Sequence, residues 1–276
     1  MKKTVEEYLK FNNDYSRANA LDYINLIFRD FIELSGDRIS GDDNAIIGGI
    51  AWLNNIAVTV IAQMRGKNLQ ENIKYNHSMC HPEGYRKSLR LMKQAEKFNR
   101  PIICFVDTLG AYPGEEAEKR GQASAIANNL MEMMHLKVPT ISILIGNGGS
   151  GGALALCVAN EIVMLENALL SVISPKGCAN ILWKDSNRDI EAAKLLKMTA
   201  YDLMKYKIID EIIEETSLEQ TSNDIKQILM SKINKYQKMP KCRLVHLRYR
   251  KYRVIGDTQS KKIIKFKLRK SDKHDI

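Results

Sequence analysis

Long apolar runs are missing from this sequence, and their absence excludes a broad class of proteins. No stretch of about 18 consecutive apolar residues occurs, so we expect no membrane-spanning helix. The N-terminal segment Met1–Tyr8 also lacks the apolar core of a secretory signal peptide. The sequence therefore predicts a cytoplasmic protein that does not insert into a membrane.

Cysteine is scarce as well. The chain of 276 residues has five cysteines, an odd number. They are widely spread, at Cys80, Cys104, Cys157, Cys178 and Cys242. This usage favours reduced, mostly buried thiols over a disulfide framework. The pattern His77-x-x-Cys80-His81 lacks the second ligand pair of a typical zinc site, so we predict a polar loop there and no metal in this chain.

A strong charge imbalance is absent from most of the chain. The net charge is +10, but residues 241–276 hold 13 Lys and Arg against 3 Asp and Glu. Residues 1–240 carry 29 of each sign and show no general signature of polyanion binding. Residues 261–270 alternate basic and apolar side chains, and we expect 257–276 to form a basic, flexible tail. Nucleic-acid binding by this tail is an alternative that we favour less.

Strand-like and helix-like patterns alternate along the chain, which predicts a layered α/β domain. Apolar residues at helical spacing predict a helix over residues 3–34, and β-branched runs predict a hairpin of strands 45–51 and 56–62 around Asn54-Asn55. We expect an N-terminal helical segment (1–40), a main domain (41–256) and the basic tail (257–276).

Two strands of this domain end in glycine-rich turns. Strand 102–107 leads through a turn into a predicted helix over 115–136, and strand 138–145 leads into the next glycine turn. Because the carboxyl ends of parallel strands meet at one edge of a sheet, we expect the two turns to be neighbours. Further strands are predicted over 161–165, 170–173 and 208–213, and further helices over 84–98 and 218–238, with two or three helices within 178–206.

The most informative stretch runs from Ile143 to Leu156. Its apolar strand stops at five glycines within residues 146–152, and a segment of small apolar residues, 153–159, follows. This pattern predicts a strand, a tight turn and a buried helix, whose first N–H groups have no partner inside the helix. Such a turn can hold an anion or a developing oxyanion with main-chain donors alone.

Two other interpretations of this stretch need consideration. Gly146-x-Gly148-x-x-Gly151, with Glu166 twenty residues after Gly146, formally matches a dinucleotide-binding fingerprint. That fingerprint normally opens the first strand–helix unit of a domain, whereas several strands precede this one. Ser150 could also be a nucleophile with His135 as its base, but His135 is predicted at the far end of a helix.

Motifs along the chain together resemble one enzyme family. They are Glu33-Leu-x-Gly-Asp-Arg38, Asp42-Asp43-x-Ala-Ile-x-Gly-Gly-Ile50, Pro82-Glu-Gly-Tyr-Arg-Lys87, Asp107-Thr-x-Gly-Ala-Tyr-Pro-Gly114, Gly148-Gly-Ser-Gly-Gly-Ala153, Ser171-Val-Ile-Ser-Pro-x-Gly-Cys178 and Ile181-Leu-Trp-Lys184. In this order, over roughly residues 15–255, the sequence resembles the carboxyltransferase α subunit of bacterial acetyl-CoA carboxylase. The resemblance implies a crotonase/ClpP-like superhelix of ββα units in a single domain, with the N-terminal helical segment, a C-terminal helix over residues 243–256 and the basic tail.

The resemblance also implies the chemistry. The family transfers the carboxyl group of carboxybiotin, held on a carrier protein, to acetyl-CoA and so forms malonyl-CoA for fatty acid synthesis. Carried over to this chain, it implies a backbone oxyanion hole that holds the biotin ureido oxygen. The implied donors are the N–H groups of Gly151, Gly152 and Ala153. The implied biotin-binding surroundings are Gly148, Gly149, Ser150, Gly110, Tyr112 and Gly114.

The implied partners lie on other chains. They are a carboxyltransferase β subunit, which carries the zinc and joins this chain in an α2β2 assembly, together with the biotin carboxyl carrier protein and the ATP-dependent biotin carboxylase.

At five positions the chain departs from the family's usual residues. Leu109 replaces a proline, Asn147 an acid, Lys176 a glutamate, and Ala62 and Ser78 replace glycines. The alternative is therefore a diverged carboxyltransferase, or another crotonase-type enzyme, acting on a different acyl-CoA.

Overall fold

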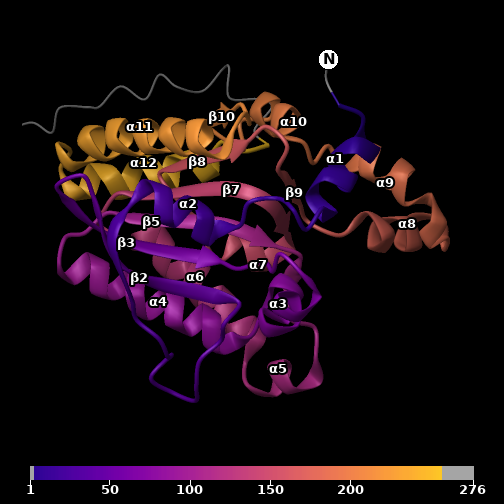
Figure 1. The fold of residues 1–276 in the computed structure, drawn as a ribbon, viewed down its shortest axis with the longest axis horizontal. Helices are drawn as coiled ribbons and strands as arrows, with labels where there is room; N and C mark the ends of the chain where they lie inside the picture. Colours follow the sequence, from indigo (N-terminus) through magenta and orange to yellow (C-terminus); the bar gives the residue numbers. More distant parts are fainter. Residues whose placement is uncertain (1–2, 257–276) are drawn as a thin grey trace, which may run out of the picture.

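The centre of the molecule is one mixed β-sheet, seen in a computed structural model that describes residues 3–256 (Figure 1). The strand order is β1-β2-β3-β5-β7-β8-β10, and β9 pairs with the end of β7. The strands are β1 (Arg29–Glu33), β2 (Ile46–Leu53), β3 (Ile56–Gln63), β5 (Ile102–Thr108), β7 (Thr140–Gly149), β8 (Glu161–Leu165), β9 (Leu169–Ser171) and β10 (Glu211–Ile213). A separate two-stranded sheet joins β4 (Met79–Cys80) to β6 (Gly110–Ala111).

Helices cover both faces of this sheet. The described residues form the helices α1 (Val5–Asn13), α2 (Ala20–Ile27), α3 (Leu69–Lys74), α4 (Pro82–Lys97), α5 (Glu115–Lys119), α6 (Gln122–His135), α7 (Ser150–Leu154), α8 (Pro175–Trp183), α9 (Asp189–Leu196), α10 (Ala200–Lys205), α11 (Leu218–Gln237) and α12 (Lys241–Arg253). Helices α4 and α6 pack together on one face, and α2 and α11 pack together on the other. None of the helices within 3–256 is long and apolar enough to cross a membrane.

The sheet changes from antiparallel to parallel along its width. Strands β1, β2 and β3 are antiparallel neighbours, whereas β3, β5, β7, β8 and β10 run parallel. Because β5 and β7 are parallel neighbours, their carboxyl ends and the glycine-rich segments that follow lie side by side. The predicted arrangement of the two turns is confirmed.

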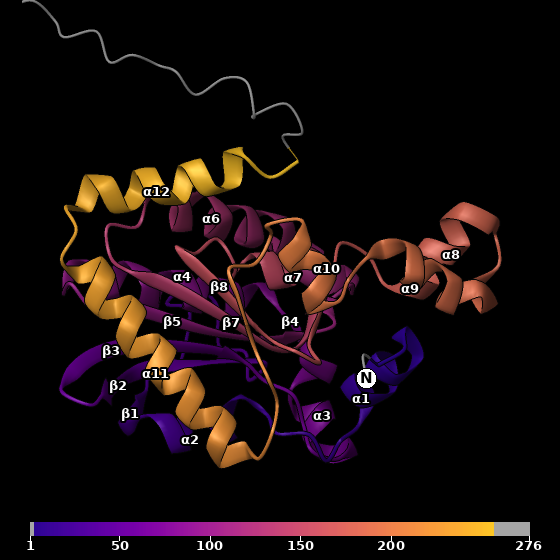
Figure 2. The same ribbon diagram turned by 90° about the horizontal axis from the view of Figure 1, so that it is seen from above.

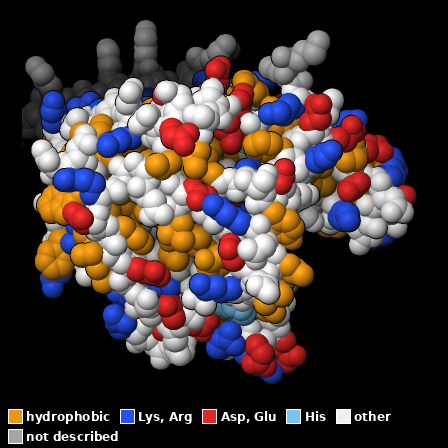
Figure 3. Space-filling model, viewed as in Figure 1, with side chains coloured by type: hydrophobic (Ala, Val, Ile, Leu, Met, Phe, Trp, Pro, Cys, Tyr) orange, Lys and Arg blue, Asp and Glu red, His pale blue; other side chains and the backbone are white. Residues whose placement is uncertain are grey.

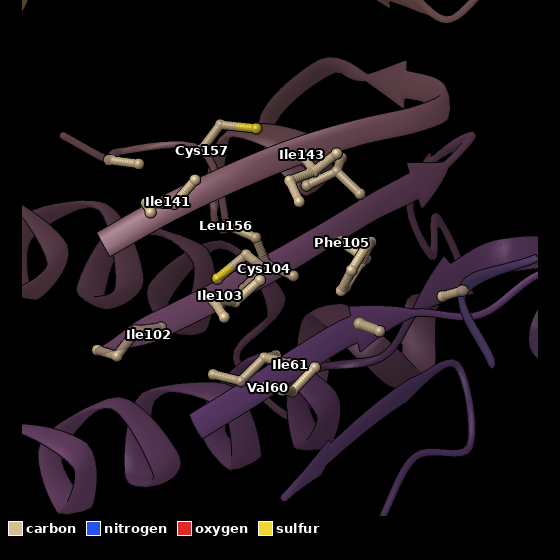
Figure 4. Close-up of a cluster of buried hydrophobic side chains, with 14 of the residues drawn as sticks. Val60, Ile61, Ile102, Ile103, Cys104, Phe105, Ile141, Ile143, Leu156 and Cys157 are labelled. Carbon is tan, nitrogen blue, oxygen red and sulfur yellow. The ribbon is translucent and has the colours of Figure 1, made fainter. Parts of the chain in front are cut away.

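Buried apolar side chains fill the space between the sheet and the helices (Figure 4). Ile103, Cys104 and Phe105 on β5 are fully buried, and their side chains alternate between the two faces of the sheet. On the α2 face, Phe105 stacks on Tyr23 and meets Phe28 edge-on, with ring centroids 6.4 and 6.3 Å apart. Buried on both faces, the strands are nearly continuous apolar runs, as expected for parallel sheets.

The predicted helix over residues 3–34 is wrong. The segment forms α1, α2 and the edge strand β1, because Asn19 caps α2 with its side chain and Phe28 ends that helix in an extended conformation. Ile32 continues the helical spacing of apolar residues by coincidence; it lies on β1, 63% exposed, and pairs with β2. Similarly, the predicted helix over 115–136 is two helices, because Gly121 takes a left-handed φ of 86° between them.

Other predicted elements are confirmed. The hairpin of β2 and β3 turns at Asn54, whose φ of 52° suits an asparagine in a tight turn. Helices α4, α11 and α12 and strands β8, β9 and β10 lie within a few residues of their predicted positions. The chain is a single domain, whereas its predicted division at residues 40 and 256 remains a prediction. The predicted tail, 257–276, lies outside the described residues.

A helical arm formed by α8, a 3-10 turn (Ser186–Arg188) and α9 projects from the body (Figure 2). In the space-filling view, the arm carries basic, acidic and hydrophobic side chains on its visible face (Figure 3). Val172, Ile181, Leu182 and Leu195 are all more than half exposed in or next to this arm. The arm returns to the body where α9 contacts α1.

Helix α12 is attached to the body by several contacts of Leu244, Tyr252 and the buried cation Arg248. The Arg248 side chain is fully buried, and its guanidinium donates to the carbonyls of Met133 at 2.7 Å and Leu136 at 2.8 Å, at the end of α6. A further hydrogen bond of 2.6 Å joins it to Asn160 Oδ1. Burial lowers the pKa of Arg248 to about 10, which still leaves the group charged at neutral pH. The positive charge also faces the negative end of the α6 dipole.

Replacing Arg248 by Met should therefore lower the free energy of unfolding by about 3 kcal/mol, because several buried carbonyls would lose their donor. Chemical denaturation of both proteins would measure the difference. Arg243→Met, at an exposed position of the same helix, is the matched control and should stay within about 0.5 kcal/mol of the parent. Equal effects of the two substitutions would contradict this role of Arg248.

Candidate active site

The glycine-rich stretch is mostly strand rather than turn. Strand β7 continues to Gly149, where Asn147, Gly148 and Gly149 pair with β9 in parallel register. The predicted buried helix over 153–159 is the five-residue α7, which begins at Ser150. The strand extends farther than predicted because β9, three residues long, supplies a partner for its backbone.

Glycine is required here because two stretches of backbone meet directly. A Cβ atom at Gly149 would lie 2.2 Å from the carbonyl oxygen of Leu109, and one at Gly152 would lie 2.6 Å from the carbonyl carbon of Gly110. Gly110 itself has a φ of 141°, which other residues rarely adopt. The ends of β5 and β7 are thus in backbone-to-backbone contact, and no side chain separates them.

Gly146 has a different role. A Cβ atom there would lie 1.8 Å from Arg17 Nη2 and 2.3 Å from Asp107 Oδ1. Arg17 and Asp107 form a buried ion pair of 2.6 Å, and Asp107 also accepts the Asn147 N–H at 2.8 Å. Gly146 therefore makes room for an ion pair.

The dinucleotide interpretation receives no support from the other residues of its fingerprint. Glu166 accepts hydrogen bonds from the Glu215 N–H and the Tyr201 hydroxyl, so its carboxylate is engaged within the protein. Helix α7 follows the glycines for only five residues. Two of the three fingerprint glycines, Gly146 and Gly148, are explained by packing, since a Cβ atom at Gly148 would lie 2.8 Å from Leu170 Cδ1.

The proposed main-chain donors lie at the start of α7. Ser150 is the first helical residue and takes a left-handed φ of 52°. The N–H groups of the first three helical residues, which include Gly151 and Gly152, have no intrahelical partner, whereas Ala153 is fourth in the helix. No side chain caps this helix. Gly151 and Gly152 are therefore the better placed of the three predicted donors.

Several buried groups that the sequence did not single out hold this segment. Gln63 Nε2 donates to the Gly152 carbonyl at 2.8 Å, and the Tyr85 hydroxyl lies where a Gly152 side chain would be. Burial raises the pKa of both Tyr85 and the neighbouring Cys80 thiol, so both stay protonated at neutral pH. Tyr85 lay within a recognised motif, but no local pattern connects Gln63 with a residue 89 positions away.

The other predicted site residues fall into two groups. Gly148, Gly149 and Ser150 line a cavity of about 450 Å³, and Gly110 contacts Gly149 and Gly152. Tyr112 and Gly114 do not line this cavity; Tyr112 stacks on His81, with ring centroids 4.1 Å apart. The structure thus brings the first group together, whereas it does not bring Tyr112 and Gly114 to the cavity.

The cavity lies between the end of β7, helix α1 and the base of the projecting arm. Its volume suits a small organic ligand. Leu109, Asn147 and Lys176, three of the positions that depart from the family's usual residues, all line it. These departures therefore change the lining of one cavity instead of being scattered over the protein.

The side chains of the nucleophile interpretation are not brought together. His135 Nδ1 lies 2.8 Å from the carbonyl oxygen of Met131 on its own helix, and Ser150 is exposed at the glycine segment. Within residues 3–256, no group of three or more His, Cys, Asp or Glu side chains is arranged to hold a metal ion.

Comparison with known proteins identifies the family. The family model described as acetyl co-enzyme A carboxylase carboxyltransferase-like matches residues 4–256. A Clostridium perfringens acetyl-coenzyme A carboxylase carboxyl transferase subunit alpha is 56% identical over 253 residues, covering 90% of this chain and 93% of that protein. The chain belongs to this carboxyltransferase α-subunit family. The family is biotin-dependent.

One relative joins two subunits in its name. It is the Clostridium tetani acetyl-coenzyme A carboxylase carboxyl transferase subunits beta/alpha, 51% identical over 259 residues. The match covers 92% of this chain but 45% of that protein, so this chain spans about half of its length. The family's carboxyltransferase is therefore built from more than one kind of subunit.

Solved structures show the same fold. A transcarboxylase 12S structure with methylmalonyl-coenzyme A bound has a TM-score of 0.67 at 19% identity and covers 81% of this chain and 43% of the other. A Pseudomonas malonate decarboxylase hetero-tetramer in complex with coenzyme A has a TM-score of 0.68 at 15% identity and covers 84% and 92%. The predicted crotonase-like fold is confirmed.

Glycines of this segment should differ sharply in their tolerance of alanine. Gly149→Ala should destabilise the protein by about 3 kcal/mol or prevent folding, because the Leu109 backbone cannot move aside cheaply. Gly151→Ala is the matched control, since its Cβ would meet only Ile126 Cγ2 at 3.7 Å. Thermal unfolding measures both effects, and a larger loss for Gly151→Ala would contradict the backbone contact.

At position 78, glycine should make the folded protein more stable than serine does. Asn76, His77 and Ser78 form three consecutive left-handed residues, with Ser78 at a φ of 64°. Ser78→Gly should raise the free energy of unfolding by about 0.5–1 kcal/mol, because relief of the left-handed strain exceeds the loss of chain entropy. Ser35→Gly, outside the left-handed region, should lower it slightly. Denaturant titration of both variants tests the sign.

Proposed function

We propose that this chain is the α half of a carboxyltransferase that moves a carboxyl group from carboxybiotin to acetyl-CoA, giving malonyl-CoA for fatty acid synthesis. The family match over residues 4–256 and the names of relatives above 50% identity support this assignment. The single structural observation that carries it is the backbone contact between the ends of β5 and β7, which brings the start of α7 next to a ligand-sized cavity lined by Gly148, Gly149 and Ser150.

The proposed roles follow from that arrangement. The N–H groups of Gly151 and Gly152, with Ala153 next to them, donate to the ureido oxygen of biotin. Gly148 and Gly149 bring the backbone close to the ligand, and Gly110, Tyr112 and Gly114 form the neighbouring wall. As the carboxyl group leaves carboxybiotin, negative charge grows on the ureido oxygen. Fixed main-chain donors at that position lower the barrier because they need no reorganisation.

The proposal requires partners on other chains. We infer a β subunit in an α2β2 assembly that supplies the acetyl-CoA enolate site and a zinc site, a biotin carboxyl carrier protein, and biotin carboxylase. The fused beta/alpha relative supports the pairing of the two carboxyltransferase halves. The proposed location of the reaction is the cytoplasm, as the sequence led us to expect.

Reconstitution tests this function. The chain mixed with its cognate β subunit should decarboxylate malonyl-CoA in the presence of biotin at least about 100-fold faster than either chain alone, since each contributes half of the site. Absence of activity with the cognate β subunit would overturn the assignment. A higher kcat/KM with another dicarboxylic acyl-CoA would instead favour the diverged enzyme.

Ser150→Ala in the reconstituted enzyme separates the oxyanion hole from a serine nucleophile. We expect kcat within about threefold of the parent, because the proposed donors are backbone N–H groups. A true nucleophile would lose about four or more orders of magnitude on the same substitution.

A further inference from the structure

A second, smaller cavity lies directly beside the large one. Its volume is about 140 Å³, and Leu109 and Asn147 line both cavities. Most of its other lining side chains are polar or charged, among them Asn72, His77 and Arg65. The cavity therefore adjoins the glycine segment but differs from the large cavity in chemistry.

Arg65 is an unusual cation in this position. It is only 8% exposed, and no carboxylate within the described residues forms an ion pair with it. Its Nη2 donates to the Asp14 carbonyl at 2.7 Å, and its Nη1 is buried without a hydrogen-bond partner among the described residues. Burial lowers the pKa of Arg65. A guanidinium has five N–H donors, so Arg65 keeps donors that form no hydrogen bond within the described residues.

Nearby carboxylates favour the charged form of Arg65 only from a distance, and within the described residues none forms an ion pair with it. Asp107 lines the same cavity, but its carboxylate is already paired with Arg17 at 2.6 Å. The Asp14 carboxylate accepts the Ser16 N–H at 2.9 Å and is exposed. Tyr15 offers its ring face, 5.7 Å from the guanidinium carbon. A buried cation without a direct ion pair is costly, so the cavity favours an anionic occupant.

The size of the cavity limits that occupant. A water molecule takes about 30 Å³ in the liquid, so the cavity has room for a group of a few non-hydrogen atoms. A carboxylate fits this size, and its planar oxygens match the fork of a guanidinium.

We propose that Arg65 and this small cavity hold the carboxylate of the group being transferred, next to the backbone donors of the glycine segment. This inference rests on the proposed function. The carboxylate could arrive on carboxybiotin or on malonyl-CoA, and both present the same chemistry to Arg65. Arg65 thereby fixes the orientation of the carboxylate while Gly151 and Gly152 face the ureido oxygen.

Anion binding can be measured without turnover. At constant ionic strength and pH, replacing chloride by 100 mM formate should raise the thermal unfolding midpoint of the full chain by about 2 °C or more, because formate binds the folded state only. Arg65→Met should abolish this rise. Arg90→Met is the matched control: Arg90 donates to the carbonyls of Leu34 and Gly36, has no ion pair among the described residues, and its loss should leave the rise intact.

A rise that persists in Arg65→Met, or that is absent in the parent chain, would overturn the proposal. Because this measurement needs no β subunit, failure of the reconstituted reaction leaves its result unaffected. The two proposals therefore fail independently.

Kinetics of the reconstituted complex identify the source of the carboxylate. If it is that of malonyl-CoA, Arg65→Met should raise the KM for malonyl-CoA about tenfold or more and leave inhibition by acetyl-CoA, which has no carboxylate, unchanged. If it is that of carboxybiotin, the KM for the carboxylated carrier protein should rise instead. Arg65→Lys should restore part of the lost affinity in either case. Unchanged KM values for both donors would overturn the role in transfer.

Discussion

The architecture of the site depends on one steric constraint, the direct contact between the backbones at the ends of β5 and β7. Gly149 and Gly152 leave no room for a Cβ atom against Leu109 and Gly110. This contact needs no side chain, and it fixes the position of N–H donors more rigidly than a flexible residue could. The same constraint explains why the segment contains so many glycines although most of it is strand.

A buried polar network holds this contact in place from the N-terminal side. Arg17 joins the loop after α1 to Asp107 on β5, and Asp107 in turn accepts the Asn147 N–H on β7. Three segments that are distant in sequence thus share one carboxylate. Removing either charge would leave the other buried and unpaired, which is far more costly than losing a surface ion pair.

Much of the fold, but less of the site, could be predicted from the sequence. Apolar runs gave the positions of β5, β7 and the hairpin, and parallel pairing placed their glycine-rich ends together. Helical spacing failed at Phe28 and Ile32, because pairing with β2 outweighed the local pattern. No local signal could reveal that Gly146 accommodates Arg17 or that Arg65 lies beside Leu109, since these contacts form only in the folded chain.

Arg248 makes completion of the fold a late event during protein synthesis. The carbonyl of Met133 gains its donor only when Arg248, 115 positions farther along the chain, has been synthesised. A ribosome-bound chain that has already formed the sheet and α6 would still expose the carbonyls at the end of that helix to water. Closure of this contact gives helix α12 a high contact order and couples the native state to the synthesis of residues 241–253.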